Sequence, residues 1–476
     1  MSLLSTLFQN EWRQFRRQRW MPLSLLLFVI IALLAIASGR SAIQTRLIQI
    51  DSIGTQYSQD YRNVLAKFND TSTAKAKAEA KNAGLAALIN YRLPQNVIKH
   101  PNALGALSIG LMDIMSWHEQ VKFVKNFGEK ADRPVSNPLV LFSGNFDYAF
   151  VLVYLMPLLV IAFCFSTFDA EKAAGIIPLL AIQTGRVEKL LRLKILFRFI
   201  VLATVLIFLN LTGFVFTAAQ PSGLSSYACW MLLSLCYLLF WFALSWFVVT
   251  FRKSGAVTAL YLVAAWMFLL VVAPSVTNSY VQARHALPLK DEIGAYYRHQ
   301  SEEIWASNAR LLSDSFNRYN PQYASTAEPA KDTQRLSERS LAGYYDLLAR
   351  RMVRVIQPYE AALKERNDLA QIMLCWNPAS LVQSGLAGLA ANDLEAYRDF
   401  VAQSDNFQIQ WQRFLYPFHF AGQKLLPDDL ARFPVFSYRQ PPLDTASVFA
   451  SVAVLILVSG LLWMAPELLK QKRNYK

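Results

Sequence analysis

The sequence predicts an all-α polytopic membrane protein with six transmembrane helices, an N-terminal interfacial helix and two mainly helical extracytoplasmic domains. Of its 476 residues, 54% are hydrophobic and only 17% are charged, whereas soluble proteins carry roughly a quarter charged residues. The apolar residues gather in six blocks, each close to the roughly 20 residues that a helix needs to cross a bilayer. Ionisable residues are missing from the middle of every block.

Each apolar block is assigned one span. The six predicted spans are residues 20–39, 148–168, 199–219, 226–249, 255–277 and 446–466. The first block has an alternative reading, because Ala35–Ala37 follows a basic leader and resembles a signal-peptidase site. Signal peptides have apolar cores of roughly 7–15 residues. This block is longer, so an uncleaved anchor is expected.

Basic residues give the orientation of the spans. Four segments that share one side of the membrane hold most of the net charge of +14: residues 1–19, 169–198, 250–254 and 467–476. Segments rich in Lys and Arg stay in the cytoplasm. We therefore expect both termini to be cytoplasmic, in the inner membrane of a bacterium. Since topology accounts for the charge, no nucleic-acid partner is expected.

Two long polar segments, residues 40–147 and 278–445, then lie on the outer side. Each is large enough for a small folded domain that gates the exit or binds a periplasmic partner. Helical spacing of apolar residues predicts helices over residues 74–88 and 336–374, the second broken at Pro358. Asp147 directly precedes the second span and is expected to cap that helix.

The N-terminal leader, residues 1–19, has two faces at helical spacing. The apolar face contains Leu4, Phe8, Trp12 and Phe15, and the basic face contains Arg13, Arg16 and Arg17. Such a helix lies in the membrane interface, where large aromatic side chains are favoured. The alternative is a basic flank that only fixes the orientation.

The segment between the second and third spans, residues 169–198, carries an apolar turn between polar residues. Exposed to the cytosol, Ile177, Leu179, Leu180 and Ile182 would leave apolar surface uncovered, and such surface usually has a partner. The alternative is a short helix buried against lipid or against the bundle. The residues alone leave both readings open.

This segment resembles the cytoplasmic loop of ABC-2-type transporter permeases. That family has an acidic-basic-acidic run, Gly-Thr, a short Leu-rich helix and a basic residue before the next span. The residues that match are Glu171, Lys172, Gly175, Ile177, Leu179 and Leu180. Ala173 and Ile176 stand where the family usually has an acid and a threonine. Six spans, an amphipathic N-terminal helix and two large outer insertions are also typical of a subgroup of the family.

The resemblance implies a membrane-spanning permease subunit, and export rather than import. Two such subunits, identical or different, would form the pathway in the bilayer and be driven by separate ABC ATPase subunits. The ATPase-coupling residues would be Glu171, Lys172, Gly175, Ile177, Leu179, Leu180, Ile182 and Arg186.

The motifs of several enzyme classes are missing from the sequence. A GxxxxGK[ST] phosphate loop does not occur, so ATP and Mg²⁺ are expected in the partner ATPase and no cofactor in this chain. His118-Glu119 lacks the second histidine of a metalloprotease helix, and the four cysteines lack metal-ligand spacing. A transporter permease, not an enzyme, is expected. The alternative function is ATP-driven mechanotransmission or signalling across the membrane without substrate passage.

Overall fold

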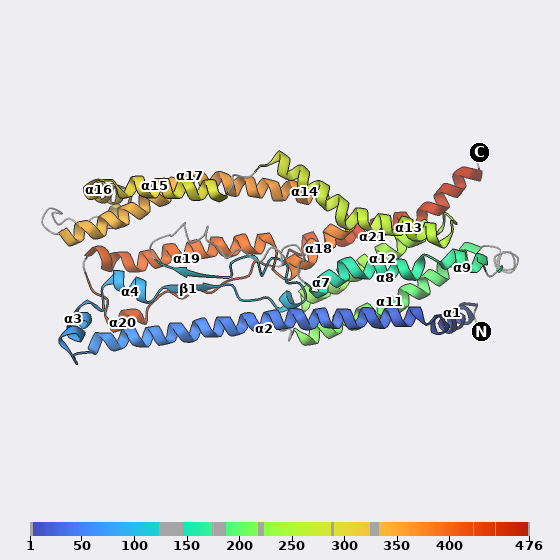
Figure 1. Ribbon diagram of the computed structural model, residues 1–476, viewed down its shortest axis with the longest axis horizontal. Helices are drawn as coiled ribbons and strands as arrows, with labels where there is room; N and C mark the ends of the chain where they lie inside the picture. The colour runs from blue at the N-terminus through green and yellow to red at the C-terminus, as the bar shows by residue number, and fades with distance from the viewer. Residues whose placement is uncertain are drawn as a thin grey trace.

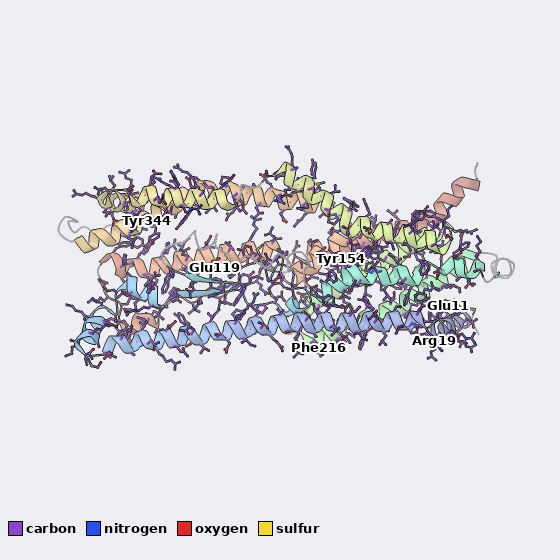
Figure 2. The ribbon with its side chains drawn as sticks, in the orientation of Figure 1. Glu11, Arg19, Glu119, Tyr154, Phe216 and Tyr344 are labelled. Carbon is purple, nitrogen blue, oxygen red and sulfur yellow. The ribbon has the colours of Figure 1, made fainter. Side chains whose placement is uncertain are left out.

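The computed structural model describes residues 3–122, 146–173, 175, 187–217, 223–286, 290–323, 333–421, 423–442 and 444–474. The molecule is elongated, and both chain ends lie at the same end of a helix bundle (Figure 1). We call this the terminal end, and we call the part of the molecule beyond the spans the distal region. Figure 2 shows Glu11 and Arg19 at the terminal end, and Glu119 and Tyr344 far along the distal region.

Six helical stretches within the described residues are long and apolar enough to cross a membrane. The protein is therefore an all-α polytopic membrane protein, as the sequence predicts. The six stretches are α2 (Trp20–Asn69), α7 to α9 (Tyr148–Phe150, η2 at Val151–Leu155, α8 at Met156–Cys164, α9 at Thr167–Ala173), α11 (Val187–Phe216), α12 (Leu224–Val249), α13 to α14 (Gly255–Met267, η4 at Phe268–Val272, Ala273–Arg284) and α21 (Thr445–Asn474).

Helix α12 is the centre of the bundle. In the most apolar 18-residue stretch of α12, 72% of the residues are buried. In the corresponding stretches of α2, α11, α13–α14 and α21 the buried share is 22–33%. Trp230, Trp241 and Trp246 of α12 are fully buried. Large aromatic side chains bury the most area per residue, so α12 anchors the packing of the other spans.

Two spans contain π-turns, η2 and η4, and a proline follows each of them. Pro157 has no N–H, so it cannot donate to the carbonyl of Val153. The hydroxyl of Tyr237 donates to that carbonyl instead, at 3.0 Å. In η4 the amide of Asn377 donates to the carbonyl of Leu269 at 2.7 Å. Side chains of neighbouring elements thus satisfy the backbone where these two spans are irregular.

The distal region has a core of its own around the distal half of α2. It is formed with α4 (Ala86–Arg92), the antiparallel strands β1 (Gln95–Ile98) and β2 (His118–Val121), α19 (Leu394–Ala421) and α20 (Pro427–Leu430). Helix α3 (Ala74–Asn82) contacts α2 and has no buried residue. The indole of Trp411 donates to Asn90 at 3.0 Å inside this core. The helix predicted over residues 74–88 is two helices, because Gly84 packs against the carbonyl of Leu425, where a Cβ would lie 2.2 Å away.

A helical arm runs beside this core (Figure 1). It consists of α14, α15 (Lys290–Trp305), α16 (Ala309–Tyr319), η5 (Pro321–Tyr323) and α17 (Thr333–Leu374). Helix α17 continues through Pro358, where the sequence predicts a break. Packing along α17 holds it together, through Leu348 and Met352. The rings of Phe316 and Phe420, 4.7 Å apart, join the arm to α19.

Parts of the two predicted outer segments return to the spans. Helix α18 (Pro378–Leu389) shares the bundle core, and Gly385 packs so closely on Leu233 of α12 that a Cβ would lie 2.7 Å from that side chain. Gly39 of α2 likewise packs on the carbonyl of Ala106 in η1 (Ala103–Ala106). Asp147 caps α7 as expected, accepting from the N–H of Phe150 at 2.8 Å.

Candidate functional site

The terminal end of the bundle is the candidate functional site, because α1 (Leu3–Arg17), α9 and the first turns of α11 meet there. It contains the predicted interfacial helix and the described members of the predicted coupling set, Glu171, Lys172 and Gly175. Figure 1 shows that the start of α13 and the last turns of α21 lie at the same end.

Helix α1 uses its predicted apolar face against the bundle. The ring of Phe8 lies 5.4 Å from that of Phe197 in α11, and the ring of Phe15 lies 6.1 Å from that of Phe163 in α8. Trp12 remains 43% exposed. The backbone of Leu4 lies in α1, while its side chain is outside the described residues. The predicted basic face, Arg13, Arg16 and Arg17, is exposed.

The predicted coupling residues divide into two groups. The structure describes Glu171, Lys172 and Gly175, and the other five lie outside the described residues: Ile177, Leu179, Leu180, Ile182 and Arg186. Lys172 is exposed on α9. Gly175 follows α9 with φ +65°, and its N–H donates to the carbonyl of Lys172 at 3.1 Å. Glycine adopts this left-handed conformation without steric cost, which ends the helix.

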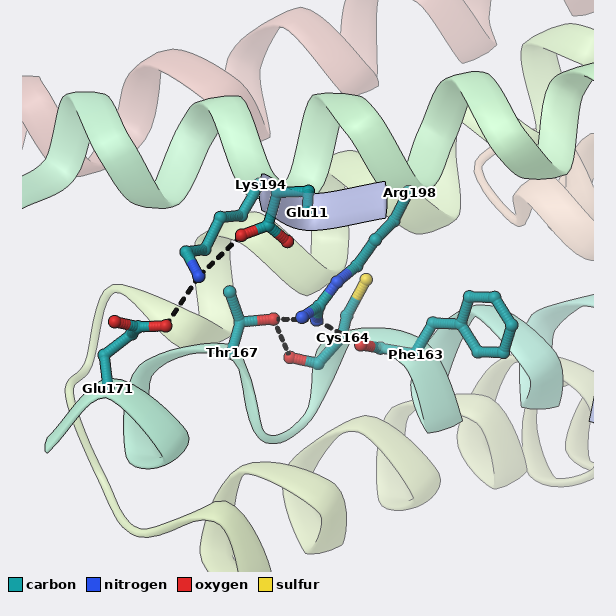
Figure 3. Close-up of polar contacts among 7 residues, drawn as sticks. All are labelled: Glu11, Phe163, Cys164, Thr167, Glu171, Lys194 and Arg198. Atoms are coloured by element: carbon teal, nitrogen blue, oxygen red, sulfur yellow. Dashed lines mark hydrogen bonds and ion pairs between the residues drawn. The ribbon is translucent and has the colours of Figure 1, made fainter. Parts of the chain in front are cut away.

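An ion cluster at this end connects three helices (Figure 3). The ammonium of Lys194 in α11 lies 2.7 Å from a carboxylate oxygen of Glu11 in α1 and 2.5 Å from one of Glu171 in α9. The exposed fractions of the three side chains are only 8%, 9% and 12%, respectively. Removing one partner of a buried ion pair leaves a charge without compensation. The cluster therefore holds α1, α9 and α11 in one arrangement.

Arg198 lies one turn beyond Lys194 and makes a second connection to the end of α8. Its guanidinium donates to the carbonyl of Phe163 and, at 2.5 Å, to the hydroxyl of Thr167. That hydroxyl donates to the carbonyl of Cys164 at 2.8 Å. Arg198 thus satisfies the carbonyl of Phe163, and the hydroxyl of Thr167 satisfies that of Cys164, at the end of α8 where the helical hydrogen bonding is interrupted (Figure 3).

Helix α9 also contacts the start of α13. A carboxylate oxygen of Asp169 accepts from the N–H of Gly255, the first residue of α13, at 2.9 Å. A carboxylate is stabilised there, because the first N–H groups of a helix lack partners within the helix and its N-terminus carries a partial positive charge. A displacement of α9 would accordingly reach α1, α11 and α13 together.

Further ion pairs connect α11 with the neighbouring spans. Arg252, after α12, lies 3.0 Å from Glu188 of α11. Arg192 of α11 pairs with Glu467 of α21, and its guanidinium lies 5.1 Å from the ring centroid of Trp246. The positive φ of Arg252, 55°, marks the tight turn that brings it to Glu188. These partly exposed pairs bind more weakly than the buried cluster.

Sequence reasoning missed the cluster, although one signal was present. Glu11 follows Phe8 by three residues and precedes Phe15 by four, so it belongs to the apolar face of α1. An acid on such a face needs a buried partner. Lys194 could not be identified as that partner, because it resembles the other basic residues of its segment.

No group of three or more His, Cys, Asp or Glu in the described part of the chain is arranged to hold a metal ion. The described contacts of α9 include those with Lys194 of α11 and with the start of α13.

Comparison with known proteins adds one finding. A family model described as a domain of unknown function, DUF3526, matches residues 282–439. This segment runs from the end of α14 through the arm, α18, α19 and α20. No curated protein and no solved structure matches the chain. Over that segment, which lies outside the terminal end, the protein is similar to the DUF3526 domain.

Proposed function

We propose that this chain is the membrane-spanning permease subunit of an ATP-driven ABC transporter of the ABC-2 type, acting as an exporter. The observation that carries the proposal is the buried cluster of Glu11, Lys194 and Glu171. It connects Glu171, the acid of the motif that resembles the family's coupling loop, to the amphipathic helix and to the third span. A push on that segment would move all three elements.

The mechanism is a coupled conformational change. Two copies of this chain, or this chain and a related one, would sit in the inner membrane of a bacterium with their termini in the cytoplasm. A separate ATPase holding ATP and Mg²⁺ would close and displace α9. Because Asp169 holds the start of α13 and Glu171 holds Lys194, the spans would repack around α12. The partner's binding energy would select the new arrangement.

Mechanotransmission without substrate passage is the second candidate, and the length of α2 favours it. This helix is 50 residues long without a break, which corresponds to about 75 Å at 1.5 Å per residue. It begins directly after α1 and ends at the far end of the distal region (Figure 1). A rod of this length could carry a movement of the terminal end across the membrane.

A pull-down of the tagged chain from its native cells in mild detergent, with mass spectrometry, tests the permease proposal. We expect an ATPase with a phosphate loop among the partners, and its loss in the L179D/L180D variant. The matched control is L426D, which changes an exposed leucine in the distal region. Recovery of well-behaved protein without any ATPase contradicts the proposal. Equal loss in both variants contradicts the coupling site.

A further inference from the structure

An apolar slot lies between α12, α13 and α21, beside the turn between α17 and α18. Its volume is about 310 Å³. Helices α12, α13 and α21, the π-turn η4, the α17–α18 turn and the start of α18 provide the lining residues, which are Phe240, Leu244, Ala265, Phe268, Leu269, Trp376, Pro378, Val458 and Leu462. All nine side chains are apolar apart from the indole N–H of Trp376.

The slot lies near the middle of the apolar spans. Further along the chain, toward the distal region, Arg366 of α17 donates to Asn278 of α14 at 3.4 Å. Asn278 is ten residues beyond Phe268, which corresponds to about 15 Å of helix. That is half the roughly 30 Å thickness of a bilayer's hydrocarbon core. The medium around the slot is thus hydrocarbon.

The packing of neighbouring elements fixes the wall of the slot. The amide of Asn377 holds the carbonyl of Leu269 in η4, and π-turns inside helices often occur at functional sites. The ring of Trp376, half exposed, lies 6.2 Å from the ring of Phe268 at the rim. These two contacts fix the side of the slot that η4 and the α17–α18 turn form.

Size and chemistry identify the occupant. A polar ligand would give up its hydrogen bonds to water and find no partner on the apolar walls, which costs several kcal/mol per group. One turn of a helix from a second copy, about 10 Å across and 5.4 Å long, takes up roughly 420 Å³, more than the 310 Å³ of the slot. A flexible hydrocarbon chain meets both conditions. We propose that the slot binds one acyl chain of a membrane lipid or lipid-modified molecule, with Trp376 against the chain at the rim.

This inference does not depend on the proposed transport function. It is tested on the full chain in nanodiscs that contain phosphatidylglycerol with a diazirine on one palmitoyl chain. After illumination, peptides are mapped by mass spectrometry. We expect the label to concentrate on peptides that contain Ala265–Leu269 and Val458–Leu462. The A265W variant, which fills the slot, should lower that label at least several-fold.

The matched control is A264W, which places the same indole on the neighbouring, exposed position of α13. A second pair, V458F in the slot and L457F on the exposed face of α21, keeps the test valid where A265W fails to fold. Equal labelling in the members of both pairs, or label spread evenly over the lipid-facing helices, overturns the proposal. A disulfide between two copies through L462C would assign the slot to a second copy and overturn it as well.

Discussion

Lys194 connects α1, α9 and α11 through two buried carboxylates. Only 8% of its side chain is exposed. Replacing it with methionine keeps the length of the side chain but leaves Glu11 and Glu171 buried without their cation. The K194M variant should lose about 3–5 kcal/mol of stability, because an uncompensated buried charge is that costly. Thermal unfolding in detergent, followed by tryptophan fluorescence, measures the loss.

Two variants isolate the charge effect. K172M removes an exposed lysine of α9 and should change the stability by less than about 0.5 kcal/mol. The triple variant E11Q/K194M/E171Q removes all three charges of the cluster, so it should recover much of the stability that K194M loses. A triple variant as unstable as K194M would show that packing, and not charge compensation, explains the loss.

His118 gives the distal region a dependence on pH. Its Nε2 lies 2.9 Å from Oδ1 of Asn96 across the hairpin. Burial lowers the pKa of His118 below its usual 6.5. Between the lowered value and 6.5 the unfolded chain binds more protons than the native state, so stability rises with pH across this window. Acidification through the window therefore destabilises the hairpin.

The H118Q variant should lose less stability than the wild type between about pH 8 and about pH 5. Unfolding midpoints at a series of pH values measure this difference, with H299Q as the control because His299 is an exposed histidine on the arm. The prediction is wrong where the wild type and H118Q lose the same stability over this range.

At the scale of elements, a kink in the distal half of α2 would distinguish between the two candidate functions. Gly54 is exposed, and a Cβ at this position would meet nothing within 4 Å. Proline there removes a helical N–H and clashes with the preceding turn, which kinks the rod at a cost of about 3 kcal/mol. Alanine there leaves the rod straight and stabilises it by about 1 kcal/mol.

Mechanotransmission requires a continuous α2, whereas transport through the spans does not. We expect the purified complex of G54P with its ATPase to keep its ATP turnover, because the site at the terminal end is unchanged. In cells that lack the native chain, expression of G54A should restore the wild-type phenotype. Expression of G54P should not restore it if α2 transmits movement. Equal phenotypes in the two variants would favour substrate passage over transmission.

At the scale of the molecule, the sequence predicts what depends on local composition. An apolar block long enough to span is visible without any tertiary information, so the six spans and the apolar face of α1 could be identified. The hairpin of β1 and β2 could not, because its strands are separated by 19 residues and are only four residues long. Helix α18 was included in an outer segment, because twelve residues are too few for a span.

Partners distant in the sequence were also beyond prediction. Glu171 was singled out for its place in a family-like pattern, yet its contact is Lys194, 23 residues later, and Glu11 reaches the same ammonium from the chain start. Pro358 was expected to break a helix. The continuous α17 shows that packing along the arm outweighs the loss of one backbone hydrogen bond.

The basic residues at the terminal end predict the orientation of the whole chain in the membrane. Both termini lie at one end of the bundle (Figure 1), where exposed arginines such as Arg13 and Arg17 gather on α1. Basic residues close to spans are retained in the cytoplasm.

In the C375S background, which removes the exposed cysteine, V435C in the distal region should react with a membrane-impermeant maleimide in intact spheroplasts. Q14C on α1 should react only after lysis. Val435 is 85% exposed and Gln14 is exposed, so accessibility across the membrane, not burial, would separate them. Reaction of Q14C before lysis, with V435C protected, would reverse the orientation and place an ATPase partner on the distal side.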